Sequence, residues 1–188
     1  MHWAKKHVII NKEIKRGLKI IKLGNKVLVS DPCYELGTWC TGVVENVKEG
    51  NYITNVAYWE DSDPFFNNRV AELEAILDGV DKDTLSWEIT KADIGVDSGQ
   101  CGIYDYESVK DIVGTGECCE KDTFYGQACQ CTDAKEKYSE LNGYGVVSCS
   151  GVGDGSYDLY IAKQDKQVVG IKVVYMDEEE QEPTDYEA

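Results

Sequence analysis

One stretch of this sequence decides the fold: Ser148-Cys149-Ser150-Gly151-Val152-Gly153-Asp154-Gly155-Ser156-Tyr157-Asp158-Leu159-Tyr160. Apolar runs that are typical of strands lie on both sides of it, at 144–147 and 159–162. Its alternating glycines allow positive φ angles and close approach of another backbone, which predicts a special loop between paired strands. The loop also places Ser150, Asp154 and Ser156 beside open backbone N–H groups. It is therefore either a well-formed turn or the wall of a binding site.

Short strand patterns fill the chain around this loop. We predict strands at 7–10, 18–23, 26–29, 41–47, 52–59, 85–90, 94–96, 144–150, 157–163 and 167–175. The segments 41–47 and 52–59 are predicted to form a hairpin, and the last three strands a meander.

Helices are predicted at three places. Val70, Leu73 and Ile76 have helical spacing, so a helix is expected from Asn67 or Asn68 to about residue 78. A short helical turn is expected at 107–113, and another helix at 132–141. Together these elements predict a mainly β (α+β) fold. It is an antiparallel β-sandwich or curled sheet with one or two peripheral helices, in a single domain over 1–176.

The charge of the chain is strongly acidic and unevenly distributed. Its 188 residues include 35 Asp or Glu and 19 Lys or Arg, a formal net charge of −16. Such a chain repels nucleic acids and anionic membranes, so neither is an expected partner. Residues 1–26 are basic, whereas 177–188 are acidic. The acidic tail is predicted to be disordered, or to be an arm that contacts the basic start or a basic partner.

The cysteines indicate a reducing compartment. No apolar run has the length of a signal peptide core or a membrane span, so a cytoplasmic protein is expected, with its eight cysteines as thiols or metal ligands. Two close pairs, Cys118-Cys119 and Cys129-Cys131, can supply four thiolates to zinc, although their spacing is tighter than usual. The alternative is a set of loop thiols. The remaining four, Cys33, Cys40, Cys101 and Cys149, are expected to act as small buried apolar residues.

Three aspartates, Asp31, Asp97 and Asp154, follow apolar strands in turn-like loops, and we expect these loops to share one end of the sheet. Each aspartate either caps its own turn, or joins a carboxylate cluster for Ca²⁺ or Mg²⁺, or lines a pocket for a small polar ligand. The candidate ligand-binding residues are Asp31, Tyr34, Trp39, Asp97, Ser98, Gln100, Asp154, Ser156 and Tyr157. This interpretation requires 151–157 and 97–102 to lie close in space.

Catalytic signals are weak in comparison. The histidines are His2 and His7, at the basic start, and a Cys–His or Ser–His–Asp arrangement would need one of them at a distant loop. No phosphate loop or dinucleotide fingerprint is present. We therefore predict no catalytic residues.

Two segments carry a resemblance to a known family. Gly95-Val96-Asp97-Ser98-Gly99-Gln100-Cys101-Gly102 and Ser150-Gly151-Val152-Gly153-Asp154-Gly155-Ser156-Tyr157 resemble the bacterial and phage family called domain of unknown function 4241. The resemblance covers the second half of the chain, with the cysteine-rich segment as an elaboration. It implies a β-rich protein of a phage or other mobile element, and it implies no activity.

Three functions are compatible with these observations. The first is a non-enzymatic binding protein that sequesters a small polar or nucleotide-type ligand, as an antagonist of host defence. The second is an acidic module that binds a host protein or mimics nucleic acid. The third is a metal-dependent hydrolase that uses Asp97 and Asp154. A homo-oligomer that pairs through an exposed strand edge is compatible with the sequence as well, and the oligomeric state stays open.

Overall fold

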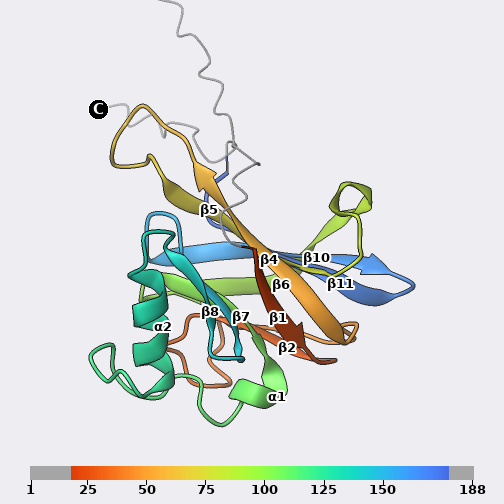
Figure 1. Cartoon of the computed structure of the whole chain (residues 1–188), viewed down its shortest axis with the longest axis horizontal. Coiled ribbons are helices and arrows are strands. Elements are labelled where there is room, and N and C mark those ends of the chain that lie inside the picture. The colour runs from red at the N-terminus through yellow and green to blue at the C-terminus, as the bar shows by residue number, and fades with distance from the viewer. Residues whose placement is uncertain (1–17, 178–188) are drawn as a thin grey trace, which may run out of the picture.

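In the computed structural model, which describes residues 18–177, two antiparallel sheets pack face to face (Figure 1). The order in the six-stranded sheet is β1 (Lys19–Leu23), β4 (Gly50–Trp59), β5 (Arg69–Leu77), β11 (Gln167–Val174), β10 (Gly155–Gln164) and β6 (Trp87–Val96). The order in the five-stranded sheet is β3 (Gly42–Val44), β2 (Val27–Ser30), β7 (Gln100–Asp105), β9 (Gly145–Cys149) and β8 (Tyr138–Leu141). The predicted β-rich fold class is confirmed.

The main core lies between the two sheets. Leu23, Tyr52 and Leu73 from the six-stranded sheet pack there with Ile103 and Val146 from the other sheet. Side chains alternate between the two faces of a strand. Cys101 and Ile103 of β7 therefore face this core, while Gln100, Gly102 and Tyr104 face the opposite side.

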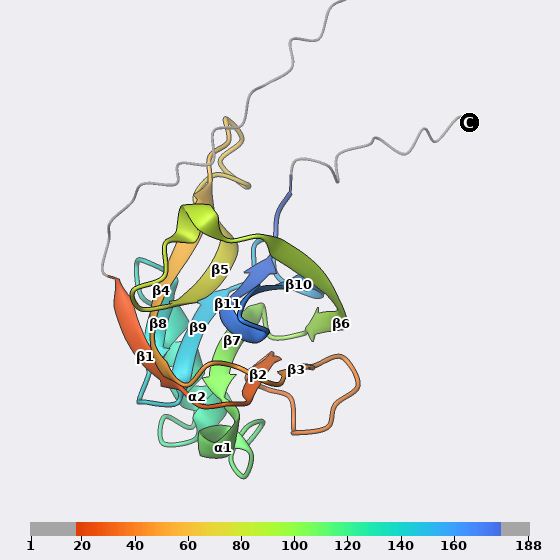
Figure 2. The same cartoon turned by 90° about the vertical axis from the view of Figure 1, so that its right-hand side faces the viewer.

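Helices cover that opposite side of the five-stranded sheet. These helices are α1 (Tyr106–Val109) and α2 (Phe124–Thr132). A 3-10 helix, η1 (Lys82–Thr84), lies elsewhere, between strands β5 and β6. Figure 1 shows α2 beside β8, and Figure 2 shows α1 and α2 at the same side of the sheet. A second core lies beneath α2, where the rings of Tyr104 and Phe124 meet edge to face at 5.2 Å. Gln100, Gly102 and Tyr104 thus point into the layer between β7 and α2.

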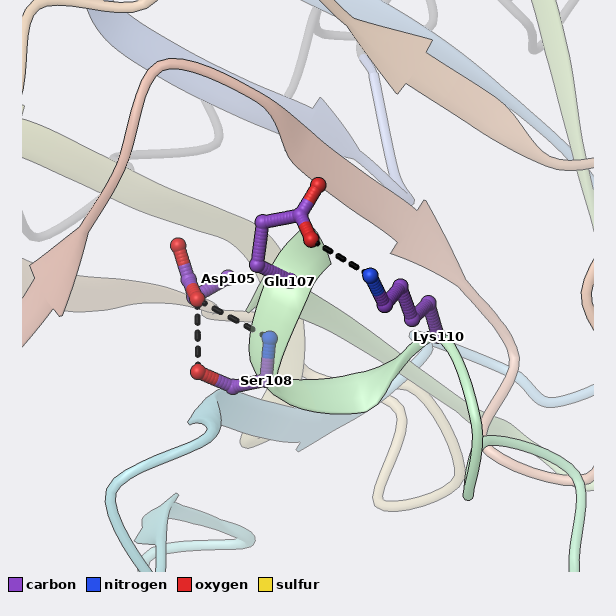
Figure 3. A network of polar contacts seen from close by, with 4 residues as sticks. All are labelled: Asp105, Glu107, Ser108 and Lys110. Atoms are coloured by element: carbon purple, nitrogen blue, oxygen red, sulfur yellow. Dashed lines mark hydrogen bonds and ion pairs between the residues drawn. The ribbon is translucent and has the colours of Figure 1, made fainter.

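Both helices begin at a polar cap. The Gly126 N–H donates to Thr123 Oγ1 at 3.2 Å at the start of α2. At α1, the N–H and hydroxyl of Ser108 donate to Asp105 Oδ2 at 3.1 and 2.6 Å (Figure 3). These caps satisfy backbone N–H groups that have no partner within a helix.

The hairpin predicted for 41–47 and 52–59 is wrong. β3 pairs with β2, whereas β4 pairs with β1 and β5 in the other sheet. The chain changes sheets between them, where the Val47 N–H donates to Asn25 O at 2.9 Å and the Lys48 N–H donates to Val168 O at 2.9 Å. Residues 45–47 therefore lie outside β3 and lead the chain from one sheet to the other.

The helix predicted for 67–78 is also wrong, because this segment is strand β5. β5 is an inner strand, and both Ala75 and Ile76, which face opposite sides, are buried. Apolar residues on both faces of a strand imitate helical spacing. Asn68, with φ of 60°, turns the chain from β4 into β5, and its N–H donates to Trp59 O at 2.8 Å.

Three further predictions change. The segment 132–141 contains the end of α2 and strand β8, not a helix. The two strands predicted at 85–90 and 94–96 are a single strand, β6, which begins at Trp87. β10 and β11 form a hairpin, but β9 lies in the other sheet, so the predicted meander is wrong and the glycine loop connects the two sheets. The strand at 7–10, both histidines and most of the acidic tail lie outside the described residues. Among residues 18–177, no helix is long and apolar enough to span a membrane.

Candidate functional site

Asp31 is the centre of the polar contacts at one end of β7. Its carboxylate is fully buried and accepts four hydrogen bonds. Oδ1 accepts from Cys33 N at 2.8 Å and from Ser98 Oγ at 2.7 Å. Oδ2 accepts from Asp97 N at 2.9 Å and from Ser98 N at 2.7 Å. Four donors compensate the burial of this carboxylate, and they tie the loop after β2 to the loop before β7.

The groups around Asp31 are neutral thiols and phenols. Burial, together with the adjacent Asp31 carboxylate, raises the pKa of Cys33 to about 12. The pKa of Tyr34 is raised by burial and then by its hydrogen bond to Asp97. Burial and the neighbouring Cys129 thiol raise the pKa of Tyr125 to about 12. Near pH 7 these three side chains are protonated and can donate hydrogen bonds.

Gln100, the first residue of β7, has an incompletely satisfied amide. Its side chain is buried, with 7% exposed, and Nε2 donates to Cys129 Sγ of α2 at 3.4 Å. Its carbonyl oxygen Oε1 is buried without a hydrogen-bond partner. The amide of Gln100 thus has one paired end, at the Cys129 sulfur, and one unpaired end, the carbonyl oxygen.

Tyr104 has a second unpartnered group on the same face of β7. Its hydroxyl is fully buried and makes no hydrogen bond. The ring lies across Gly102, since a Cβ at Gly102 would come within 2.2 Å of the Tyr104 hydroxyl oxygen. The hydroxyl therefore lies over Gly102, which shares this face of β7 with Tyr104 and Gln100. We refer to the following set as the Asp31–Gln100 site: Asp31, Cys33, Tyr34, Asp97, Ser98, Gln100, Tyr104, Tyr125 and Cys129.

One other buried side-chain atom in the described part of the chain lacks a partner, and its setting differs. It is Oε2 of Glu74, whose other oxygen forms an ion pair with Lys82. A cation already compensates that carboxylate, so the group is part of a paired contact between β5 and η1. The two neutral groups at the Asp31–Gln100 site have no such compensation.

The predicted proximity of 151–157 and 97–102 is confirmed. The Ser150 N–H donates to Gly99 O at 3.0 Å, and Gly155 pairs with Val96 across β10 and β6. A Cβ built on Gly99 would lie 3.8 Å from Gly153 Cα. Two loops far apart in the sequence are therefore in contact behind the Asp31 carboxylate.

Of the nine predicted ligand-binding residues, five lie together in the Asp31–Gln100 site and four lie elsewhere. Asp31, Tyr34, Asp97, Ser98 and Gln100 belong to the site. Trp39 is 86% exposed and Asp154 is exposed. Ser156 donates to Asp93 on the exposed surface of β10 and β6.

Tyr157 is buried in the main core, and its hydroxyl donates to Gly153 O at 2.7 Å and lies 3.2 Å from Ser150 O. The Ser150 hydroxyl also donates to Gly153 O, at 2.8 Å. The glycine loop is thus closed by its own hydrogen bonds. For this loop the structure supports a turn rather than the wall of a site.

The residues predicted to bind metal are not gathered. Among residues 18–177, no three His, Cys, Asp or Glu side chains come together in a way that could hold a metal ion. Cys118 and Cys119 are exposed before α2, Cys129 contacts Gln100, and the Cys131 thiol donates to Glu140 O at 3.5 Å. The structure therefore assembles neither the zinc site predicted on these cysteines nor a Ca²⁺ or Mg²⁺ site on the three loop aspartates.

None of the family models, curated proteins and solved structures with which the chain was compared matches it. The resemblance to domain of unknown function 4241 consequently has no support beyond its two sequence segments. Arguments about function rest on the geometry of this chain.

Sequence reasoning missed Cys33, Tyr104 and Tyr125 as members of the site. A signal for Tyr104 was present, because Gln100, Gly102 and Tyr104 alternate and would share a face if 100–105 were assigned as a strand. Tyr125 had no such signal, since its place depends on the packing of α2 against the five-stranded sheet.

Proposed function

We propose that this chain is a non-enzymatic binding protein that holds a small, uncharged polar molecule at the Asp31–Gln100 site. The observation that carries this proposal is the buried, unpartnered carbonyl of Gln100. An unsatisfied buried polar group costs about 1–3 kcal/mol, so a fold that keeps one retains an unfavourable feature. A bound molecule that donates an N–H or O–H to this oxygen removes that cost, which gives the feature a role.

The arrangement of exposure around Gln100 supports access from one side. Cys33, Tyr34, Tyr125 and Cys129 are half-buried, whereas Gln100 and Asp31 are buried. A ligand can thus meet donors and aromatic rings at the outer part of the site and the Gln100 carbonyl at its depth. Sites of this type commonly combine apolar surface with a few polar groups.

The charges at the site favour a neutral ligand over a phosphorylated one. Burial is the main cause of the raised pKa values of Cys33, Tyr34 and Tyr125, and the neighbouring groups that also raise them are carboxylates and thiols. A phosphate placed among them would be repelled by Asp31 and Asp97. Asp31 already accepts four hydrogen bonds, so it does not require a cationic ligand. Of the nucleotide-type ligands expected from the sequence, a nucleoside or free base fits better than a phosphate ester.

The chemistry of Cys33 supports binding without catalysis. A thiol attacks as its thiolate, and the raised pKa of Cys33 keeps the proton on sulfur near pH 7. Residues 18–177 contain no histidine that could accept this proton. The sequestration of a small host molecule, the first of the functions expected from the sequence, requires binding alone.

The test uses the full chain and defined probes. Native mass spectrometry of protein purified from lysate detects a carried molecule, and calorimetry with uridine, adenosine, uracil and adenine measures binding. The matched phosphates, UMP and AMP, should bind at least tenfold more weakly than their nucleosides.

Gln100→Met should remove the binding of the neutral probe while the protein stays folded. Gln164→Met, at an exposed position of β10, is the control and should bind as the wild type does. The proposal is overturned if no molecule is carried and no neutral probe binds, or if Gln100→Met binds normally.

A further inference from the structure

We infer that a hollow between strands β3 and β6 binds a short fatty acid, with the alkyl chain inside the hollow and the carboxylate on Lys166 at its mouth. The hollow has a volume of about 260 Å³, and residues of β3, β6, β10 and β11 line it. It shares no lining residue with the Asp31–Gln100 site. This second binding site therefore goes beyond the proposed function and does not depend on it.

The hollow lies where the two sheets come apart at one side of the molecule. β3 is a terminal strand of its sheet and β6 is a terminal strand of the other, and Figure 2 shows both at the same side. Hydrogen bonds join the sheets at either end of the hollow. At one end the Gly95 N–H donates to Cys40 O at 2.9 Å, and at the other Asn46 Nδ2 donates to Lys166 O at 2.8 Å. An extended peptide that continued past the hollow would meet these contacts, whereas a short ligand fits between them.

The floor of the hollow is apolar and continuous with the main core. Val44, Leu159 and Val168 are buried there, and the half-buried Ala92 and Ile161 pack against that core. Covering such a floor with an alkyl chain is favourable in proportion to the apolar area that is removed from water. The hollow is slightly smaller than the pockets of about 300–1,000 Å³ that hold drug-sized ligands. The ligand is therefore small, and the part of it that enters is apolar.

Three charged side chains border the hollow, and two of them are already paired. Glu45 forms an ion pair with Lys26 at 3.5 Å, and Lys163 forms one with Glu88 at 3.1 Å. Lys166 makes no ion pair within the described part of the chain, residues 18–177. It is the second residue of the turn between β10 and β11, with φ of 69°, and its carbonyl contact with the end of β3 holds this turn beside the hollow. The charge left for a ligand is thus a cation.

A carboxylate on a short alkyl chain matches both the floor and the mouth. The chain covers the apolar floor, and the carboxylate oxygens accept hydrogen bonds from the ammonium of Lys166. Because an exposed ion pair contributes little, most of the affinity comes from the chain, and the cation selects an anionic head group over a neutral one. The net charge of −16 opposes an anion at long range, but salt screens charges beyond about 8–10 Å.

The first test varies the chain of the ligand and the room in the hollow. Calorimetry with the full chain should show affinity rising about two- to fourfold for each added CH₂ from butanoate through hexanoate to octanoate. Ala92→Leu fills the hollow from β6 and should weaken octanoate binding at least tenfold. Ala57→Leu, at a half-buried alanine of β4 outside the lining, is the matched control and should bind as the wild type does.

The second test concerns the head group. Lys166→Gln should weaken octanoate about fivefold and leave 1-octanol unchanged, because only the carboxylate meets the cation. Lys135→Gln, at an exposed lysine outside the lining, should change neither. Gln100→Met should bind octanoate as the wild type does, since it alters the other site alone.

The site is ruled out if octanoate does not bind, if chain length has no effect, or if Ala92→Leu binds normally. Should Ala92→Leu fail to fold, Ile161→Gln, which makes the half-buried floor polar, must show the same loss. Loss of octanoate binding in Gln100→Met would place the ligand at the Asp31–Gln100 site instead. Equal binding of octanoate to wild type and Lys166→Gln would contradict the assignment of the carboxylate to Lys166.

Discussion

Asp31 and Asp105 play the same structural role at opposite ends of β7, yet their surroundings differ in one decisive respect. Each carboxylate joins segments that are distant in the sequence. Asp31 connects the loop after β2 to residues 97 and 98, and Asp105 accepts from Gly24 N at 2.8 Å while it caps α1 (Figure 3). Asp31 follows strand β2 and Asp105 ends strand β7, so each aspartate stands where a strand gives way to another segment.

The Asp105 end is polar, partly exposed and internally satisfied. It borders a hollow of about 580 Å³ whose lining includes Lys22, Lys26, Glu49 and Glu107, so charges of both signs compensate one another. None of the buried unpartnered side-chain atoms in residues 18–177 belongs to this lining. The Asp31 end is buried, and there Gln100 and Tyr104 each keep an unpaired atom. The two ends of β7 therefore share a capped loop, and the unpaired groups are what distinguishes the Asp31 end.

The largest contrast is expected from removing each carboxylate. Asp31→Ala leaves three N–H groups and the Ser98 hydroxyl without an acceptor in a buried place, and should lower the free energy of unfolding by about 4 kcal/mol. Asp105→Ala should cost about 1 kcal/mol, as for the loss of a helix cap. Urea titration followed by fluorescence measures both. Asp31→Asn, which keeps the shape, should fall between them if Asp31→Ala does not fold, and equal losses at both ends would contradict the comparison.

A second contrast uses glycines near the two ends of β7. A Cβ at Gly102 would lie 2.1 Å from the Tyr104 ring, which is buried and cannot move freely. Gly102→Ala should therefore destabilise the protein by about 3 kcal/mol and displace the Tyr104 hydroxyl. At Gly24 a Cβ would meet only Asp105 Oδ1, at 3.0 Å, so Gly24→Ala should cost less than about 1 kcal/mol. Thermal unfolding of the two variants measures both changes in stability. A larger loss of stability in Gly24→Ala than in Gly102→Ala would contradict this packing.

The sequence predicted the part of the site that depends on local chemistry. Asp31, Asp97 and Ser98 lie in short loops whose turn residues are recognisable without knowledge of the fold. Their meeting also followed from the expectation that strand-end loops share one end of a sheet. Tyr125 depends instead on the packing of α2, and α2 was predicted in the wrong place because Thr132 resembles a helix start as much as Thr123 does.

The errors in the fold have a related cause. Residues 69–77 combine good helix formers with apolar positions on both faces, and only their place between β4 and β11 makes them a strand. Likewise, 41–47 and 52–59 alternate as hairpin strands do, but each finds its partner elsewhere in the chain. Pairing between distant strands overrides local preference, so fold class was predictable while sheet order was not.

A smaller effect with the opposite sign is expected at Gln100. In the ligand-free protein, Gln100→Met removes the unpaired carbonyl and keeps the length of the side chain, so the free energy of unfolding should rise by about 1 kcal/mol. The control Gln164→Met should stay within about 0.5 kcal/mol of the wild type. Urea titration without added probe compares the three proteins. A loss of stability in Gln100→Met would show that the carbonyl has a partner and that the two ends of β7 are alike.

The effect that is smallest near neutral pH, and that grows only in alkaline solution, concerns the proton on Cys33. The unfolded thiol has a pKa of about 8.5, whereas the folded one is raised to about 12. The folded state therefore binds more protons between these values, and stability should fall as pH rises from about 9 toward 12. Cys33→Ser, whose hydroxyl does not ionise in this range, should show a shallower decline.

Alkylation compares the half-buried Cys33 with the exposed Cys118 and Cys119 in the same molecule. Iodoacetamide at pH 8 should modify the exposed Cys118 and Cys119 well before Cys33, since it reacts with the thiolate and the Asp31 carboxylate opposes a second negative charge beside it. Peptide mass spectrometry over a time course measures the order of modification. Rapid modification of Cys33 would mean that its thiol is ionised, which would reopen a nucleophilic role for the Asp31 end of β7.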